Sequence, residues 1–411
     1  KDDMKPALGV TEPGAIAFAV AKARSFTKGD IKKVNVAMNS GMYKNAFTCG
    51  IPNSNEVGNV FAAALGVVAG NADKGLESLA DVTPEDNVKA QEMIDQGKIT
   101  VELSGITSRI FIEATVETEE DKAIVTIRDS HTNITKIIVN DKVELETEDE
   151  KKTEEDGGEE ESHSIHKYTL QQLYDYVTTV DIEEIRFINE AYKVNLELFH
   201  EGLENPRTTF ARQLLAINNG KEVSDDEQKT ASLMCNAAIE ARVIGLDKPA
   251  MSITGSGAHG IIATMPLYAA YKVNGYTEEQ LLRATALSYL VCMYIKEYSG
   301  RLSAFCGCAI AAGSGMACAL VYLRGGTVEM MAHTLNNMAS SITGMICDGG
   351  NQGCTMKGVA AVDAAYKSVE FAMNGIYISE VHGINGNTPE ETMRNMGLIA
   401  SPGMVGTEKT I

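Results

Sequence analysis

The chain has 411 residues, of which 44% are hydrophobic and 22% are charged, and these proportions are ordinary for a globular protein. A chain of this length can form two domains, each with its own core. Its formal net charge of −20 argues against nucleic acid and anionic membrane surfaces as partners, because both attract proteins with a surplus of Lys and Arg.

The first predicted element is a helix over Leu8–Arg24. Thr11 is a candidate N-cap, Glu12 favours the positive end of the helix, and Pro13 is tolerated in the first turn. We expect residues 1–26 to pack with the helical domain farther along the chain, which makes the segment that follows an insertion.

Residues 27–167 have the pattern of an inserted α/β domain. A capping box at Thr83 predicts the start of a helix, and alternating apolar residues predict half-buried strands. We expect a sheet covered by helices on one side. The expected strands are 31–39, 99–103, 109–117, 123–128 and 134–144, and a further helix is expected at 57–70.

An acidic stretch at 146–163 ends this domain. The segment from Glu144 to Glu161 contains eleven acidic residues and two lysines, a net charge of −9. Such a segment cannot bury enough apolar surface to fold, so we expect a mobile loop.

Residues 168–411 are predicted to be all-α. Helices are expected at 169–179, 181–201, 206–218, 224–244, 260–273, 277–297, 302–323, 327–345, 355–373 and 389–398. The uncharged segment Leu302–Leu323 is long enough to span a membrane, but it is rich in Gly, Ala, Ser and Cys, so we interpret it as a buried helix. The predicted fold class is α+β, with a large all-α domain and an inserted α/β sheet domain.

Five of the eight cysteines lie between residues 306 and 354. This clustering in a long chain is typical of metal chemistry in a reducing compartment, and we expect a cytoplasmic protein. Cys347 and Cys354 enclose a loop with three glycines, and Cys306 and Cys308 precede the small-residue helix. Thiolates prefer iron–sulfur clusters, zinc or copper(I).

Free cysteines also occur simply as small buried residues, and the spacing alone does not decide between the two interpretations. We apply the second interpretation to four cysteines that have no partner nearby in sequence: Cys49, Cys235, Cys292 and Cys318.

The segment Ser252–Gly260 is a turn rich in glycine and hydroxyl groups, followed by a predicted helix. Backbone N–H groups at such a helix start can bind a carboxylate or a phosphate. It lacks the lysine of a P-loop and the preceding strand of a dinucleotide fingerprint. His259 is a candidate acid or base, or a structural histidine.

Four motifs together carry a family resemblance. LGVTEP (8–13), GSGAHG (255–260), GRLSAFCG (300–307) and TGMICDG (343–349) resemble the motifs of L-cysteine desulfidases, members of the iron–sulfur L-serine dehydratase α-chain superfamily. The resemblance extends over nearly the whole chain. It implies a PLP-free lyase that converts L-cysteine to pyruvate, ammonia and sulfide.

The resemblance also implies roles for individual residues. Cys306, Cys347 and Cys354 match the three ligands of a [4Fe–4S] cluster, with Cys308 as the substitute for Cys306, so residues 168–411 form the cluster-binding catalytic domain. His259 is implied as a catalytic residue. Thr11, Glu12, Ser256 and Gly257 are implied to bind the substrate, with the glycine turn holding its carboxylate.

Two positions depart from the family pattern. Val10, at an implied catalytic position, stands where these enzymes usually have Cys, and Ala258 stands where Asn is common. Val10 cannot ligate or transfer a proton, which leaves two alternatives open: an L-serine dehydratase with the same chemistry, or a non-catalytic amino-acid-binding homologue. A homodimer is the default expectation for a soluble enzyme.

Overall fold

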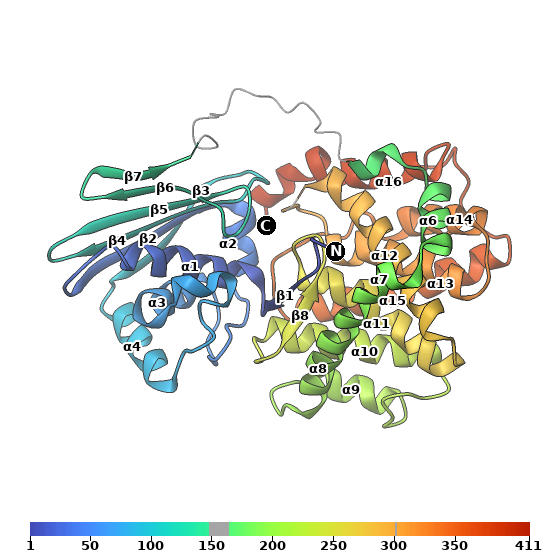
Figure 1. Cartoon of the computed structure of the whole chain (residues 1–411), viewed down its shortest axis with the longest axis horizontal. Coiled ribbons are helices and arrows are strands. Elements are labelled where there is room, and N and C mark those ends of the chain that lie inside the picture. The colour runs from blue at the N-terminus through green and yellow to red at the C-terminus, as the bar shows by residue number, and fades with distance from the viewer. Residues whose placement is uncertain (148–163, 301) are drawn as a thin grey trace.

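The computed structural model describes residues 1–147, 164–300 and 302–411. Figure 1 shows two parts side by side: a sheet with helices beneath it, and a larger group of helices that contains most of the second half of the chain. This is the α+β fold that the sequence predicts. The predicted acidic loop at 146–163 lies, apart from its first two residues, outside the described residues.

Six strands form one mixed sheet in the order β3-β2-β4-β5-β6-β7. β2 and β3 are parallel, and the other neighbours are antiparallel. Every second residue of β4 is buried, as expected of a strand with one face against a core. The bounds are β2 Ile31–Asn39, β3 Ile99–Gly105, β4 Phe111–Thr118, β5 Lys122–Arg128, β6 Ile134–Val139 and β7 Lys142–Glu146.

The strand predictions are confirmed with one exception. The single segment expected at 134–144 consists of two strands, β6 and β7, joined by a tight turn. Asn140 and Asp141 occupy this turn with φ of +49° and +65°, the conformation that a two-residue hairpin requires.

Two helices cover one face of the sheet, α1 Thr11–Arg24 and α3 Asn59–Ala69, and α4 Pro84–Asp95 packs against α3. The predicted capping box at Thr83 is present at the start of α4. Two shorter elements, α2 Ser40–Ala46 and the 3₁₀ turn η1 Ala72–Glu77, complete this domain.

The prediction for α1 is wrong in two respects. Val10, not Thr11, is the N-cap, and the helix packs against α3, β4 and β5 rather than with the helical domain. α1 is buried on nearly all sides, so its sequence has no polar face that would indicate its neighbours. Small residues allow close packing with α3: a Cβ on Gly66 would lie 2.8 Å from the Cα of Ala17.

Residues near the chain start still reach the helical domain through a pair of short strands. β1 (Lys5–Leu8) pairs antiparallel with β8 (Pro249–Ser252). Neither strand was predicted, because four residues are too few for a recognisable alternation.

The helical domain confirms the predicted run of helices. Two expected helices are divided: 181–201 contains α7, η3 and α8, and 302–323 contains the π-helical turn η4 and α13. The bounds are η2 Ser164–Lys167, α6 Leu170–Thr179, α7 Ile182–Ile185, η3 Arg186–Ile188, α8 Asn189–Glu204, α9 Phe210–Ile217, α10 Glu227–Val243, α11 Gly257–Asn274, α12 Glu278–Ser299, η4 Cys308–Ala312, α13 Gly313–Leu323, α14 Val328–Ile342, α15 Gly353–Met373, α16 Pro389–Leu398, η5 Ile399–Gly403 and η6 Val405–Lys409.

The small-residue helix α13 lies in the centre of this domain, with its residues from Gly313 to Val321 buried. This burial agrees with the interpretation of the uncharged segment as a core helix. Within the described ranges, no helix has the length and apolarity needed to cross a bilayer.

Candidate functional site

A cavity of about 90 Å³ lies where the sheet domain meets the helical domain. Its wall is built by the start of α1, by α2, by the β5–β6 turn, and by α10, α11 and α12, together with the segments 302–308 and 347–354. Nine of the residues singled out in the sequence line it: Val10, Thr11, Glu12, Ser256, Ala258, His259, Cys308, Cys347 and Cys354. Gly257 and Cys306 lie between lining neighbours but are not themselves lining residues.

One wall of the cavity is rich in thiols because two chain segments pair there. Phe305 and Ile346 form an isolated antiparallel bridge. The N–H of Cys306 donates to the carbonyl of Met345 over 2.8 Å, and that of Cys347 donates to Ala304 over 2.7 Å. The pairing brings together two cysteines about forty positions apart.

The other two thiols of this wall lie at helix starts. Cys308 begins η4, and Cys354 lies in the first turn of α15, where its thiol donates to the carbonyl of Gly349 over 3.4 Å. A hydrogen bond with Cys306 lowers the pKa of Cys308 well below its usual value and raises that of Cys306 well above it. Burial raises the pKa of Cys354 to about 12.

These four thiols are soft donors of the kind that iron–sulfur clusters use, so the donor chemistry fits such a group. Their arrangement does not form a closed coordination sphere: across 1–147, 164–300 and 302–411, no three Cys, His, Asp or Glu side chains are arranged to hold a metal ion. The other four cysteines, Cys49, Cys235, Cys292 and Cys318, are fully buried, as expected for structural residues.

His259 lies in the first turn of α11 and is 4% exposed. Its Nδ1 lies 2.6 Å from the hydroxyl oxygen of Thr254, and this hydroxyl is also 2.7 Å from the carbonyl of Ile253. The hydroxyl has a single proton, so when it donates to Ile253 it accepts from Nδ1–H. Nε2, on the other side of the ring, then points towards Gly307 in the cavity wall, and the ring also interacts with the thiol of Cys308.

Thr254 is itself in an unusual conformation, with φ of +53°. A β-branched residue is strained in the left-handed region, at a cost on the order of 1–3 kcal/mol. Strain of this kind persists where the surrounding structure requires it, and here it holds the hydroxyl against His259.

Glu12 is buried at the start of α1, between two side chains of the sheet domain. Its Oε1 accepts a hydrogen bond from Asn45 over 3.0 Å and lies 3.6 Å from Nε2 of His131. Burial raises the pKa of Glu12, but His131, Asn45 and the charge of Arg242 together outweigh this effect and lower the pKa to about 2. Glu12 therefore carries a full negative charge at neutral pH.

Two buried basic side chains also line the cavity, and neither was predicted from the sequence. Arg242 on α10 is 5% exposed and Lys296 on α12 is 6% exposed. Burial lowers the pKa of Lys296, while the neighbouring thiols oppose that effect. A signal for Lys296 existed: it follows an uncharged run from Ala284 to Ile295 in a predicted helix. Asn45 and His131 gave no such signal.

The residues that match a known family cover most of the chain. A model of the family described as "Serine dehydratase alpha chain" matches residues 73–411. The chain belongs to this family.

Several curated relatives match along the entire chain. A UPF0597 protein of Clostridium botulinum (strain Hall) is 41% identical over 413 residues, covering 100% of this chain and 96% of the relative. A UPF0597 protein of Caldanaerobacter subterraneus subsp. tengcongensis is 36% identical, covering 100% and 95%. One of Bacteroides fragilis is 34% identical, covering 99% and 94%.

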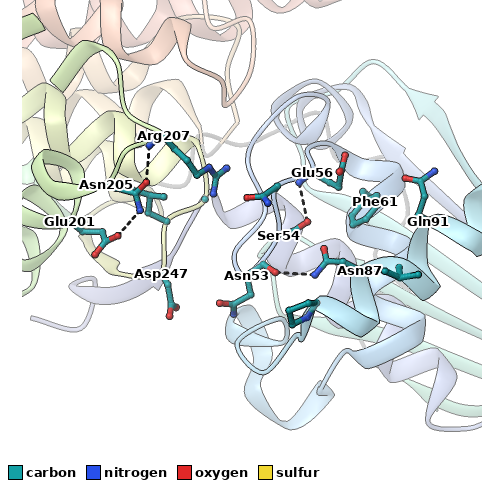
Figure 2. A pocket seen from close by; sticks show the side chains of 15 residues that line it. Asn53, Ser54, Glu56, Phe61, Asn87, Gln91, Glu201, Asn205, Arg207 and Asp247 are labelled. Atoms are coloured by element: carbon teal, nitrogen blue, oxygen red, sulfur yellow. Dashed lines mark hydrogen bonds between the residues drawn. The ribbon is translucent and has the colours of Figure 1, made fainter. Parts of the chain in front are cut away.

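This member of the serine dehydratase alpha chain family has a second, larger cavity of about 570 Å³. Figure 2 shows Asn53, Ser54 and Asn87 of the sheet domain facing Asn205 and Arg207 of the helical domain across it. It is open, and none of the predicted site residues lines it. The labelled polar groups largely bond within their own domain, so the smaller cavity is the better candidate for catalysis.

Proposed function

We propose that this protein is a PLP-free β-elimination lyase that converts L-cysteine to pyruvate, ammonia and sulfide. The observation that carries the proposal is the small cavity, where the thiols of Cys308, Cys347 and Cys354 face the same space as His259 and Glu12. Its volume suits a substrate of few heavy atoms, because pockets for drug-sized ligands are typically about 300–1,000 Å³.

The ligands proposed for a [4Fe–4S] cluster are Cys306, Cys347 and Cys354. A cluster held by three protein ligands would supply a Lewis acid for the leaving β-substituent. Cys308 is the alternative to Cys306, and its position in the cavity lining supports testing both.

The protein side chains then supply substrate binding and proton transfer. His259 is proposed to accept the α-proton at Nε2, since Thr254 holds the other ring nitrogen. Loss of the α-proton and of the β-thiolate gives aminoacrylate, which takes up water to form pyruvate and ammonia. Burial of the cavity keeps bulk water away from the proton acceptor.

L-serine is the second candidate substrate, and the family description favours it. Its β-hydroxyl would leave as water by the same elimination. The two candidates differ in one product, because only L-cysteine releases sulfide.

Assays of anaerobically purified and reconstituted protein test both candidate substrates. We expect absorbance near about 400 nm, roughly four irons per chain, and sulfide and pyruvate in equal amounts from L-cysteine. Cys347→Ala is expected to abolish iron binding, and the matched variant Cys318→Ala, at a buried cysteine away from the cavity, is expected to retain it. Cys306→Ala and Cys308→Ala identify the third ligand. If the protein forms pyruvate from L-serine but releases no sulfide from L-cysteine, then L-serine is the substrate and L-cysteine is not.

A further inference from the structure

The guanidinium group of Arg242 contains a buried nitrogen that is not hydrogen-bonded to the described residues. The residue is 5% exposed, and Nε is fully enclosed and makes no hydrogen bond to any part of the chain that the structure describes. Leaving a buried charged donor unpaired is costly, so such a group is retained where it meets an anion. The charge of Arg242 acts on Glu12 in the same cavity, but Nε donates to no carboxylate of the described residues. Because Arg242 lines the small cavity, a ligand carboxylate is expected to accept from it.

A helix start lies against the same guanidinium. α11 begins at Gly257, and its N-cap residue Ser256 makes no side-chain capping bond. A Cβ at Gly257 would lie 2.6 Å from Nε of Arg242, so only glycine allows this approach. The first-turn N–H groups of an 18-residue helix and a guanidinium fork thus face one place, and both bind carboxylates well.

The same cavity also contains a negative charge, the carboxylate of Glu12. Glu12 lines it, and its Oε1 accepts a hydrogen bond from Asn45 and lies 3.6 Å from Nε2 of His131. Oε2 accepts no hydrogen bond from the described residues. One carboxylate oxygen is therefore available to a cation in the cavity.

We infer that Arg242 and the start of α11 bind the α-carboxylate of the substrate while Glu12 binds its α-ammonium group, so that the cavity selects small zwitterionic α-amino acids. This inference rests on the proposed function, and it adds how the substrate is selected. The substrate must have both an α-carboxylate and an α-ammonium group, and the cavity of about 90 Å³ limits the size of its side chain. With both groups held, the Cα–H and Cβ bonds take a fixed direction towards His259 and the thiol wall.

Binding of L-alanine tests the inference without chemistry, because L-alanine has no leaving group on Cβ. We would measure its Kd by calorimetry on the anaerobic holoprotein, and compare L-lactate, which lacks the ammonium group, and ethylamine, which lacks the carboxylate. We expect L-alanine to bind and both analogues to bind at least about thirtyfold more weakly.

Variants assign the two halves of the site. Arg242→Gln is expected to weaken the binding of L-alanine at least about thirtyfold. Arg242→Lys keeps the charge but loses the two-pronged guanidinium, and it is expected to weaken this binding less. Glu12→Gln is expected to weaken the binding of L-alanine without weakening the binding of L-lactate. Arg207→Gln, in the larger cavity, is the matched control and is expected to leave the Kd unchanged.

Three results would overturn the inference: no L-alanine binding by the parent, an unchanged Kd in folded Arg242→Lys and Arg242→Gln, or equal binding of L-lactate and L-alanine. Failure of the proposed function has a different signature. In that case L-alanine binds with the expected variant pattern, but neither L-cysteine nor L-serine is consumed.

Discussion

Val10 occupies a corner of the small cavity beside the thiol wall. Its side chain is 3% exposed and packs over Gly350, where an added Cβ would lie 2.8 Å from Cγ1 of Val10. Gly350 belongs to the loop between Cys347 and Cys354. An apolar group therefore stands at the position where the resemblance leads us to expect a catalytic thiol.

Restoring that thiol is expected to raise the rate of sulfide release. Valine and cysteine are similar in size, so Val10→Cys should fit without strain. A thiol just before the first turn of α1 would have its thiolate stabilised by the helix dipole. A gain of at least roughly a hundredfold in kcat with L-cysteine is expected if this group transfers a proton.

The control for this prediction is Val20→Cys, at a buried position in the same helix but outside the cavity lining. It should not raise the rate. If the parent already releases sulfide rapidly and Val10→Cys changes nothing, then Val10 serves only in packing and proton transfer does not need a group at this position, which leaves His259 as the proposed proton acceptor.

At the scale of elements, α2 connects the small cavity to a buried ion pair. On one side, Asn45 binds Glu12, and its carbonyl accepts the N–H of Gly350 over 3.0 Å. On the other side, Nζ of Lys44 lies 3.3 Å from Oε1 of Glu408 in η6, whose side chain is 2% exposed. Ser40 also donates to this carboxylate. The pair thus fixes a helix that supplies a cavity residue.

Removing the charge of Glu408 is expected to destabilise the protein. Glu408→Gln leaves Lys44 buried without its counter-ion, which typically costs about 3–5 kcal/mol. The free energy of unfolding from urea titration measures the loss. The exposed pair of Lys32 and Glu119 offers a matched control, and Glu119→Gln should cost less than about 1 kcal/mol. Equal losses in the two variants would show that the ion pair of Lys44 does not hold α2.

At the scale of the whole molecule, two glycines allow the domains to touch through their backbones. The N–H of Gly50 donates to the carbonyl of Val243 over 2.7 Å. A Cβ on Gly50 would lie 2.1 Å from the carbonyl carbon of Ile244, and one on Gly245 would lie 2.7 Å from the backbone of Ile51. Because Arg242 directly precedes Val243, this contact helps to hold Glu12 and Arg242 in the lining of one cavity.

Gly50→Ala is therefore expected to separate the domains locally and weaken the Kd for L-alanine at least about tenfold, because the two charges no longer face the ligand at the right spacing. Gly105→Ala is the control, since a Cβ there meets nothing within 4 Å. Calorimetry on both variants, with circular dichroism to verify folding, measures the effect. A folded Gly50→Ala protein with the parent's affinity would contradict the role given to this contact.

Local sequence patterns determined much of the molecule. Alternation predicted β2 to its exact bounds, and the capping box at Thr83 predicted the start of α4, because both signals lie within a few neighbouring residues. Sequence motifs and cysteine spacing also indicated nine of the residues that line the small cavity.

Only the tertiary structure decided which domain α1 joins and which charges enter the cavity. A helix buried on nearly all sides has no polar face, so its sequence is compatible with several neighbours. Arg242, Asn45 and His131 come from three elements far apart in the chain, and no spacing relates them. Their meeting depends on the approach of the domains at Gly50 and Gly245, and a long-range contact of this kind leaves no period in the sequence.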